Sequence, residues 1–572
     1  MARINPQRAF VQKRFSGFSG IGSHVPLGGK GATDVCNFRI RSDGALVLRE
    51  GSRKLLTLPE SPIRGFWEGA VGDSMLCFAV AGSSVYRVSL SDATYTLCTT
   101  LDAVPETVAF AVFAGTLYLF DGQQIRFYQA AYDRFAPIQP YVPLYGSNWH
   151  PSTGGFANEP LNLLTADLRI HYLNEGGSTT FRLPFSGDAI QSVSVPGKRL
   201  TDYTFTQYDN TVTIPSAASY TDVTIAYTVS LSPDAKNEMN AARGALACAL
   251  GQTEALLLYG TPTGNRVYCS REIPALDMAR CQAVYPSALP LYFPESDVLL
   301  IGTGDAPIRK ILPYRDGLLA LNAIGAWNLE RDGEGTIVAS AAFGSVGISS
   351  ANAATVCGNT IAVANESGIH LLKSDSARSG ALQSECISLP IKEDLTNLLL
   401  QNAMLFQNTK TNELWVCRPN APTGSIRVWS FTREEWYRFR GFAPSLLFCA
   451  SCGVGYAQND ALYVFDDTLA VDATSPISCY YTGDYMDLDA ADTPRRTVRA
   501  SVCAELHEGS LNLILSTERS AKTFLMKGGT TSPEYFDFRM RAGRHRFLRF
   551  RLYAYAPHVG LTIYKTAFYG NR

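Results

Sequence analysis

Hydrophobic residues recur along this chain at every second position, in short runs that end at glycine, asparagine or aspartate. A period of two is typical of a β-strand with one buried face, because successive side chains of a strand point to opposite sides. Two such runs joined by a polar turn predict a β-hairpin. Hairpins of this kind are predicted at Val71–Val88, Val112–Tyr128, Gly251–Cys269, Tyr314–Leu329, Val356–Leu372, Thr411–Trp429 and Gly455–Asp466.

These hairpins recur at a spacing that suggests a repeat. Neighbouring units start about 40 residues apart, which is the length of one four-stranded blade of a β-propeller. A hairpin with one apolar face cannot bury that face alone, so stacking against neighbours is expected. The pattern therefore predicts an all-β chain with a β-propeller of about seven blades, six to eight being possible. Unrelated hairpins in β-sandwiches are the alternative.

The long gap between the second and third hairpins predicts an insertion with strands of its own. A small β-sandwich is expected from alternating segments at Leu168–Leu173, Thr179–Leu183, Ile190–Val195, Tyr203–Thr206, Thr211–Ile214 and Val223–Val229. Another sandwich or jelly roll is expected from Ile477–Tyr485, Arg496–Leu506, Ser510–Ser516, Tyr535–Met540, Phe547–Tyr555 and Leu561–Phe568. One helix is predicted, at Ser232–Leu250, from its Ser-Pro-Asp start and alanine-rich continuation.

These patterns divide the chain into five parts. The predicted parts are a basic N-terminal arm at 1–33, a first propeller part at 34–158, the inserted sandwich at 159–231, a second propeller part at 232–473 and a C-terminal sandwich at 474–572.

Composition supports a folded chain without a strong net electrostatic field. The 572 residues are 46% hydrophobic and 18% charged, and the net charge is -1. Such a balance excludes disorder and a globally basic nucleic-acid binder. The 13 cysteines are an odd number and are widely scattered, which favours reduced core thiols in a cytosol over a disulfide scaffold. The sequence has no secretory signal and no apolar run long enough to predict a membrane helix.

The sequence carries no nucleophile-elbow, phosphate-loop, zinc-protease or dinucleotide-binding motif, so we expect no enzyme, no cofactor and no metal. The histidines are far apart, and Cys449 and Cys452 form a lone pair that is interpreted as core thiols. The acidic run Asp484, Asp487, Asp489 and Asp492 lacks the spacing of a calcium loop and is interpreted as a solvated turn. Three tryptophans are expected in the blade core rather than on a sugar platform, namely Trp415, Trp429 and Trp436.

Three passages resemble tail nozzle and tail-stabilisation (tail tubular) propeller proteins of short-tailed double-stranded DNA bacteriophages. The first spans Asp34–Lys54 and matches an N-x6-G-x-L-x-x-R-x-G pattern through Asn37, Gly44, Leu46, Arg49 and Gly51. The second spans Val193–Val229 and is similar to small β modules of phage tail and fibre proteins. The third comprises Tyr481–Asp487, Arg495–Val498 and the arginine-rich strands up to Arg551, and it resembles the terminal sandwich of these proteins.

The resemblance implies a structural virion protein that forms a ring, often a hexamer, around the DNA exit channel. Its expected partners are further copies of itself, the adaptor and portal side of the tail, tail fibres, and genomic DNA that passes without sequence-specific contact. Its expected location is the tail of a virion assembled in the host cytoplasm. The alternative is a receptor- or carbohydrate-binding propeller protein at the tail tip.

Two basic segments are candidates for subunit interfaces. The N-terminal arm contributes Arg3, Arg8, Lys13 and Arg14, and it is expected either to order on a neighbour or to stay solvated. The C-terminal strands contribute Arg539, Arg541, Arg544, Arg546, Arg549 and Arg551. Their alternation places pairs on one strand face. Ion pairs between subunits are favoured over DNA contact and over a solvated face, because a channel that binds phosphates tightly slows the passing DNA.

Two uncharged loops rich in proline and aromatic residues are candidates for lining or plugging a channel. They span Tyr141–Ala157 and Tyr285–Pro294, and ordinary packing between blades is the alternative. The candidate residues are Tyr145, Trp149, His150, Tyr285 and Tyr292.

Overall fold

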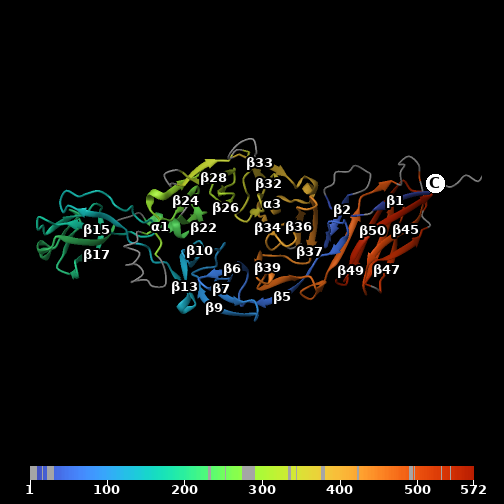
Figure 1. Cartoon of the computed structure of the whole chain (residues 1–572), viewed down its shortest axis with the longest axis horizontal. Coiled ribbons are helices and arrows are strands. Elements are labelled where there is room, and N and C mark those ends of the chain that lie inside the picture. The colour runs from blue at the N-terminus through green and yellow to red at the C-terminus, as the bar shows by residue number, and fades with distance from the viewer. Residues whose placement is uncertain are drawn as a thin grey trace, which may run out of the picture.

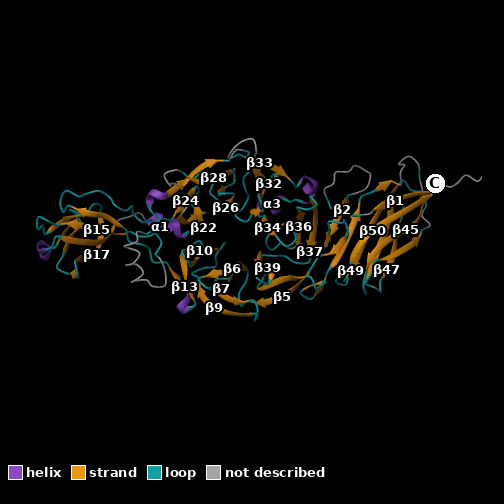
Figure 2. Ribbon diagram, viewed as in Figure 1, coloured by secondary structure: helices purple, strands orange, loops and turns teal. Residues whose placement is uncertain are grey.

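The computed structural model is mostly β, with 57% of residues in strands and 5% in helices. It describes residues 10–15, 17–21, 31–229, 233–250, 253–273, 290–332, 337–342, 344–374, 381–421, 424–487, 494, 496–529, 531–540 and 543–571. Figure 1 shows an elongated molecule with three parts in a row, and Figure 2 shows that strands form nearly all of each part.

The central part contains, within the described residues, seven four-stranded antiparallel units, all called sheets below. Five of them are separate sheets, and the last two are parts of larger sheets. The first four are β6 (Ile63–Val71), β7 (Ser74–Ala81), β8 (Ser84–Ser89) and β9 (Thr94–Thr100); β10 (Ala109–Phe113), β11 (Thr116–Phe120), β12 (Ile125–Gln129) and β13 (Arg134–Pro137); β22 (Gly244–Leu250), β23 (Thr253–Tyr259), β24 (Arg266–Cys269) and β25 (Val298–Leu300); and β26 (Lys310–Tyr314), β27 (Gly317–Leu321), β28 (Ala326–Arg331) and β29 (Ile337–Ala341).

The other three sheets follow along the chain. They are β30 (Ala354–Cys357), β31 (Thr360–Asn365), β32 (Gly368–Ser374) and β33 (Leu382–Cys386); β34 (Met404–Asn408), β35 (Glu413–Cys417), β36 (Ser425–Ser430) and β37 (Glu435–Arg440); and β38 (Leu446–Ala450), β39 (Gly453–Gln458), β40 (Ala461–Asp466) and β5 (Gly51–Thr57). Each predicted hairpin forms the second and third strands of one sheet, so all the predicted hairpins are confirmed.

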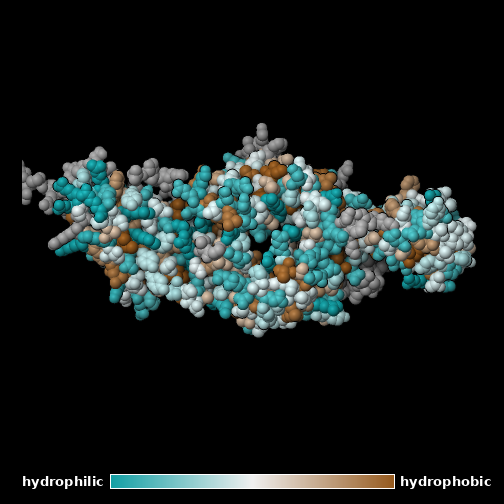
Figure 3. All heavy atoms as spheres, turned by 180° about the vertical axis from the view of Figure 1, so that it is seen from behind, coloured by the Kyte–Doolittle hydropathy of each residue, from teal (hydrophilic) through white to brown (hydrophobic). Residues whose placement is uncertain are grey.

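The first strands of these sheets contact one another in series, from β6 through β10, β22, β26, β30 and β34 to β38. The series closes, because β38 also contacts β6. The seventh sheet takes three strands from late in the chain and its fourth from β5, which pairs antiparallel with β40. We call these sheets the ring. Figure 3 shows the surface hollowed near the middle of the ring, with hydrophobic residues on this face in small groups.

The inserted module lies between the second and third sheets of the chain, at one end of the molecule (Figure 1). Its larger sheet contains β14 (Leu144–Trp149), β15 (Asp167–Leu173), β21 (Asp222–Val229), β17 (Gly187–Val195) and β18 (Lys198–Leu200), and its smaller sheet contains β16 (Thr180–Arg182), β20 (Thr211–Thr213) and β19 (Thr204–Thr206). The two sheets share one hydrophobic core. All the strands predicted here are present, and β14 and β18 were not predicted.

The terminal module lies at the other end, where the C-terminus is marked (Figure 1). One sheet contains β3 (Phe38–Ile40), β4 (Leu46–Leu48), β50 (Thr562–Asn571), β45 (Arg496–Glu505), β48 (Glu534–Arg539) and β1 (Phe10–Phe15). The facing strands are β2 (Ala32–Cys36), β43 (Ser478–Gly483), β49 (Phe547–Tyr555), β46 (Ser510–Thr517), β47 (Ala521–Lys527) and β44 (Met486–Asp487). The predicted strands are present, and β47 was missed.

The N-terminal boundaries differ from the prediction. Residues 34–48 were assigned to the first propeller part. Instead β2 pairs with β43 and with β37, β4 pairs with β50, and β3 pairs with β4 at the edge of the same sheet. Part of the predicted basic arm is also a strand, since β1 pairs with β50 of the same chain. The sequence pattern is local and does not show which distant strand a segment will pair with.

Helices are few and short. The described helices are α1 (Pro233–Asn240) and α3 (Asn397–Gln401), with 3-10 turns η1 (Ala130–Tyr132), η2 (Pro215–Ser219), η3 (Glu295–Asp297) and η4 (Leu389–Asp394). Two short strands, β41 (Val471–Asp472) and β42 (Ser475–Pro476), extend the seventh sheet. The predicted helix at Ser232–Leu250 is wrong in its second half, which forms β22 between two neighbouring sheets. Tertiary packing here overrides the helix propensity of alanine. Among the described residues, no helix is long and apolar enough to cross a membrane.

Candidate functional site

Three residues of the Asn37–Gly51 pattern, Asn37, Arg49 and Gly51, come together in a buried joint between the terminal module and the ring. Asn37 has a left-handed backbone (φ 58°), and its side-chain amide donates to the Ser478 carbonyl at 2.7 Å. Its Oδ1 accepts from Arg49 Nε at 2.9 Å and from the Arg440 amide at 2.8 Å. One asparagine therefore joins the terminal module, the ring and the segment that enters β5.

Arg49 is the centre of this joint and is only 1% exposed. Its guanidinium is paired with both carboxylate oxygens of Asp472, with Nη1 at 3.0 Å from Oδ1. It also donates to the carbonyl oxygens of Glu50 and Arg440, at 2.7 and 2.8 Å, and lies over the Phe442 ring. Every face of the buried cation is thus met by an oxygen or an aromatic ring, as a desolvated charge requires.

Neighbouring backbone lies too close to the glycines of the pattern to admit a side chain, and the leucine of the pattern is a core residue. A Cβ on Gly51 would collide with the carbonyl oxygens of Val471 and Leu469. Gly44 has φ +83°, and a Cβ there would lie 2.8 Å from the Cα of Gly17. Leu46 is fully buried in the core of the terminal module. Gly51 is therefore a packing requirement of the joint, and Gly44 and Leu46 are packing requirements of the terminal module.

A second buried ion pair lies beside the first and was missed by sequence reasoning. Arg39 donates through Nε to Glu413 at 2.7 Å and through Nη2 at 3.2 Å, and it also pairs with Glu50. Glu413 is 1% exposed and accepts from Trp415 Nε1 at 2.9 Å and from the Tyr437 hydroxyl. The only signal in the sequence is an acidic residue that opens the apolar run Glu413–Cys417.

The electrostatics of Glu413 follow from competing causes. Burial by itself raises its pKa, but the charge of Arg39 and the hydrogen bonds from Arg39, Tyr437 and Trp415 outweigh burial, so the pKa lies below its usual value of 4.5. The neighbouring Tyr437 has a strongly raised pKa, because of burial first and the adjacent Glu413 charge second. The acid is therefore held ionised and the phenol neutral.

The arginines predicted at interfaces fall into distinct groups. Arg549 and Arg551 share the outer face of β49, as the alternation predicts, and both have partners in their own chain. Arg549 donates to the Gly483 carbonyl at 3.2 Å and lies over Tyr485, while Arg551 lies 4.2 Å from the centre of the Tyr480 ring. Both arginines are therefore held in place by contacts within the terminal module.

The remaining candidates are exposed or undescribed. Arg14, Arg539, Arg544 and Arg546 are exposed on the terminal module, and Lys13 lies in β1. Arg3, Arg8 and Arg541 lie outside the described residues. An interface role for these groups stays a prediction.

Three of the channel-loop candidates lie in the inserted module. Trp149 is 7% exposed in the core of the inserted module, with Tyr145 packed against it at 6.0 Å between ring centres. His150 is exposed at the end of β14 and accepts from the Thr153 amide at 3.2 Å. The inserted module is at one end of the molecule (Figure 1), and a place for these side chains along a channel between copies stays a prediction.

The two remaining loop candidates have separate outcomes. Tyr292 is 2% exposed, and its hydroxyl donates to the Pro160 carbonyl at 2.8 Å. It packs on Tyr141 in the connection between the inserted module and the ring. Tyr285 lies outside the described residues.

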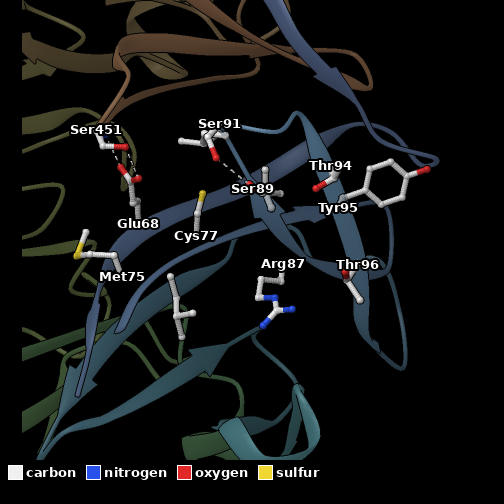
Figure 4. A pocket seen from close by; sticks show the side chains of 13 residues that line it. Glu68, Met75, Cys77, Arg87, Ser89, Ser91, Thr94, Tyr95, Thr96 and Ser451 are labelled. Atoms are coloured by element: carbon white, nitrogen blue, oxygen red, sulfur yellow. Dashed lines mark hydrogen bonds between the residues drawn. The ribbon is translucent and has the colours of Figure 1, made fainter. Parts of the chain in front are cut away.

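A cleft of about 420 Å³ lies on the first sheet of the ring, next to the turn between β38 and β39 (Figure 4). Its Glu68 accepts from the Ser451 amide and hydroxyl, at 2.5 and 2.7 Å. Arg87 pairs with Asp133 at 3.1 Å. Burial, with a smaller contribution from Glu68, raises the pKa of Cys77 to about 12. The charged groups are thus engaged and the thiol is protonated at neutral pH.

The predictions for the tryptophans, the cysteine pair and the acidic run have different outcomes. Trp415, Trp429 and Trp436 are buried, which confirms their prediction as core. Cys449 is exposed beside the turn that carries Cys452, so the interpretation of this pair as core thiols is wrong for Cys449. Asp489 and Asp492 lie outside the described residues. Over the described ranges, no cluster of three histidine, cysteine or acidic side chains is suited to a metal ion.

Comparison with known proteins places this chain in no family: no family model matches it, and no curated protein sequence matches it.

Proposed function

We propose that this protein is a structural subunit of a bacteriophage tail, built on a seven-bladed β-propeller with an inserted and a terminal β-sandwich. Copies of it close into a ring, a nozzle that continues the DNA exit channel below the portal and adaptor. The ring retains the packaged genome and lets it pass on infection. The role is mechanical rather than catalytic, and the protein belongs to the virion.

The observation that carries the proposal is the joint around Arg49. Of the residues on which the resemblance to tail nozzle proteins rests, Asn37, Arg49 and Gly51 seat β5 between the terminal module and the ring. Gly44 and Leu46 pack inside the terminal module that the joint holds. Residues of one motif that together form a joint support a shared architecture more strongly than scattered matches do. The closed series of first strands supports the propeller.

The charge balance fits a channel component. A net charge of -1 is compatible with passage of DNA, since each neutralised phosphate raises affinity and slows transit. Copies in a closed ring meet through the same pair of surfaces at every contact. The exposed Arg544 and Arg546 are placed at such a contact in this proposal, together with acidic groups of the next copy.

Negative-stain electron microscopy of the purified full chain, alone and with the tail adaptor of the same phage, tests this function. We expect rings with a central hole wide enough for a DNA duplex. The charge reversal R544E/R546E should leave single particles, whereas the matched reversal K198E/R199E in the inserted module should still give rings. Particles of the unaltered protein that stay single with the adaptor contradict the proposal, and glycan binding by such particles favours the tail-tip alternative.

A further inference from the structure

A cavity of about 590 Å³ lies at one face of the ring, between the fourth, fifth and sixth sheets. It is bordered by the residue before β26, the segment before β30, the turns β27–β28 and β31–β32, and the end of α3. In a four-stranded antiparallel sheet, the start of the first strand and the second turn lie at the same end. The cavity therefore opens on a single face of the ring, where labels β26, β32 and α3 lie close together in Figure 1.

The cation in its wall has no acidic partner. Arg309 is partly buried, and its Nη1 donates to the carbonyl oxygens of Ile348 and Ser349 at 2.5 and 2.7 Å. No carboxylate of the described chain pairs with it, and burial alone lowers its pKa. A partly buried cation without an acidic partner is expected where an anion offsets the cost of its desolvation.

The rest of the lining combines the apolar Ala323 and Ile348 with several polar side chains, and the described lining has no aromatic residue. The side chains of Asn365, Glu366, Ser367 and Gln401 border the cavity. Glu366, Ser367 and Gln401 are exposed, and the Ser367 hydroxyl donates to Asn365 at 2.6 Å and lies 2.8 Å from His370 Nε2. Amides, a hydroxyl and a carboxylate that does not pair with Arg309 are suited to the hydroxyl groups of a sugar.

We propose that this cavity binds a small polyhydroxylated oxyanion, an acidic sugar or a sugar phosphate, with Arg309 on the oxyanion and Glu366, Asn365 and Gln401 on the hydroxyls. The guanidinium is held by two backbone carbonyls, so its remaining donors are already oriented for a carboxylate or phosphate group. This site is separate from the assembly role proposed above and does not depend on it.

Isothermal titration calorimetry of the full chain at low ionic strength tests the site, with D-glucuronate and D-glucose 6-phosphate as probes and D-glucose as the neutral comparison. We expect saturable binding of at least one charged probe, at least tenfold tighter than glucose. The preferred probe distinguishes carboxylate from phosphate. R309Q should weaken binding at least tenfold, while R315Q, the same change at the opposite end of β26, should leave it unchanged.

A second variant keeps the test decisive if R309Q fails to fold. Glu366 is exposed on a turn, and E366Q retains hydrogen bonding while it removes a negative charge near the anion. Affinity for the charged probe should rise about threefold relative to affinity for glucose, as expected for loss of a screened repulsion. No binding of either charged probe at millimolar concentration, or equal affinity in wild type, R309Q and E366Q, overturns the proposal.

Discussion

At the scale of single residues, the fold is held where charge is buried. Arg49 is removed from water and pairs with Asp472, and the mostly buried Arg39 pairs with the fully buried Glu413. Breaking a buried pair by removing one partner is costly, because the charge that remains is neither hydrated nor paired. Exposed pairs such as Arg41 with Asp43 contribute little, since water screens them.

R49M should therefore lower the free energy of unfolding by about 3–5 kcal/mol, because it leaves Asp472 buried without its cation. R41M, a matched loss of one guanidinium, should cost less than about 1 kcal/mol. Urea unfolding followed by tryptophan fluorescence measures both. In the double variant R49M/D472N part of the loss should return, and equal costs for R49M and R41M would refute the buried joint.

Glu413 makes a pH-dependent contribution. Its pKa in the folded chain is lowered below 4.5, so the unfolded chain binds more protons in the window below that value. The stability it contributes is present above pH 4.5 and is lost as the pH falls toward the folded-state pKa. The difference in melting temperature between wild type and E413Q should therefore shrink as the pH falls from 7 to about 3. A difference that stays constant over this range contradicts the assignment.

At the scale of elements, alternation predicted the strands well and their partners poorly. All the hairpins and most strands of both modules follow the two-residue period. The failures are segments where distant packing decides, namely β22, which carries helix-forming alanines, and β2 to β4, which pair with the C-terminal end. β5 is the element on which the ring depends, because it completes a sheet whose other strands lie 400 positions later.

G51A should prevent β5 from seating correctly, because the added methyl group meets the backbone oxygens of Val471 and Leu469. We expect a fall of several degrees in melting temperature, and faster hydrogen exchange of the amides in both β5 and β40. G176A is the matched control, because an added Cβ there has no neighbour within 4 Å. Unchanged exchange in β40 would show that β5 does not close the seventh sheet.

At the scale of the whole molecule, the many buried phenols and thiols limit the stability of the folded chain at alkaline pH. Burial raises the pKa of Tyr128 and Tyr259 to about 12, from 10.0, and that of Cys269 and Cys417 to about 12, from 9.0. In each case the folded state holds its proton longer than the unfolded state. The associated stability is complete below pH 9 and is lost as the pH rises from 9 toward 12.

Melting temperature measured by circular dichroism under reducing conditions should accordingly stay level from pH 7 to 8.5 and fall steeply above pH 9 to 10. The fall should be smaller in Y259F, because this change removes one titrating hydroxyl and keeps the aromatic side chain. A melting temperature that is independent of pH up to 11 would contradict burial of these groups in the folded chain.

Local chemistry is enough to define the strands, the turns and the division into a ring and two modules, because alternation and turn residues act over a few positions. The pairing of Arg49 with Asp472 joins residues 423 positions apart, and only the closed fold brings them together. The same holds for Arg39 with Glu413, for β5 in the seventh sheet and for the cavity at Arg309. These contacts depend on where the chain returns after hundreds of residues, and no local pattern carries that information.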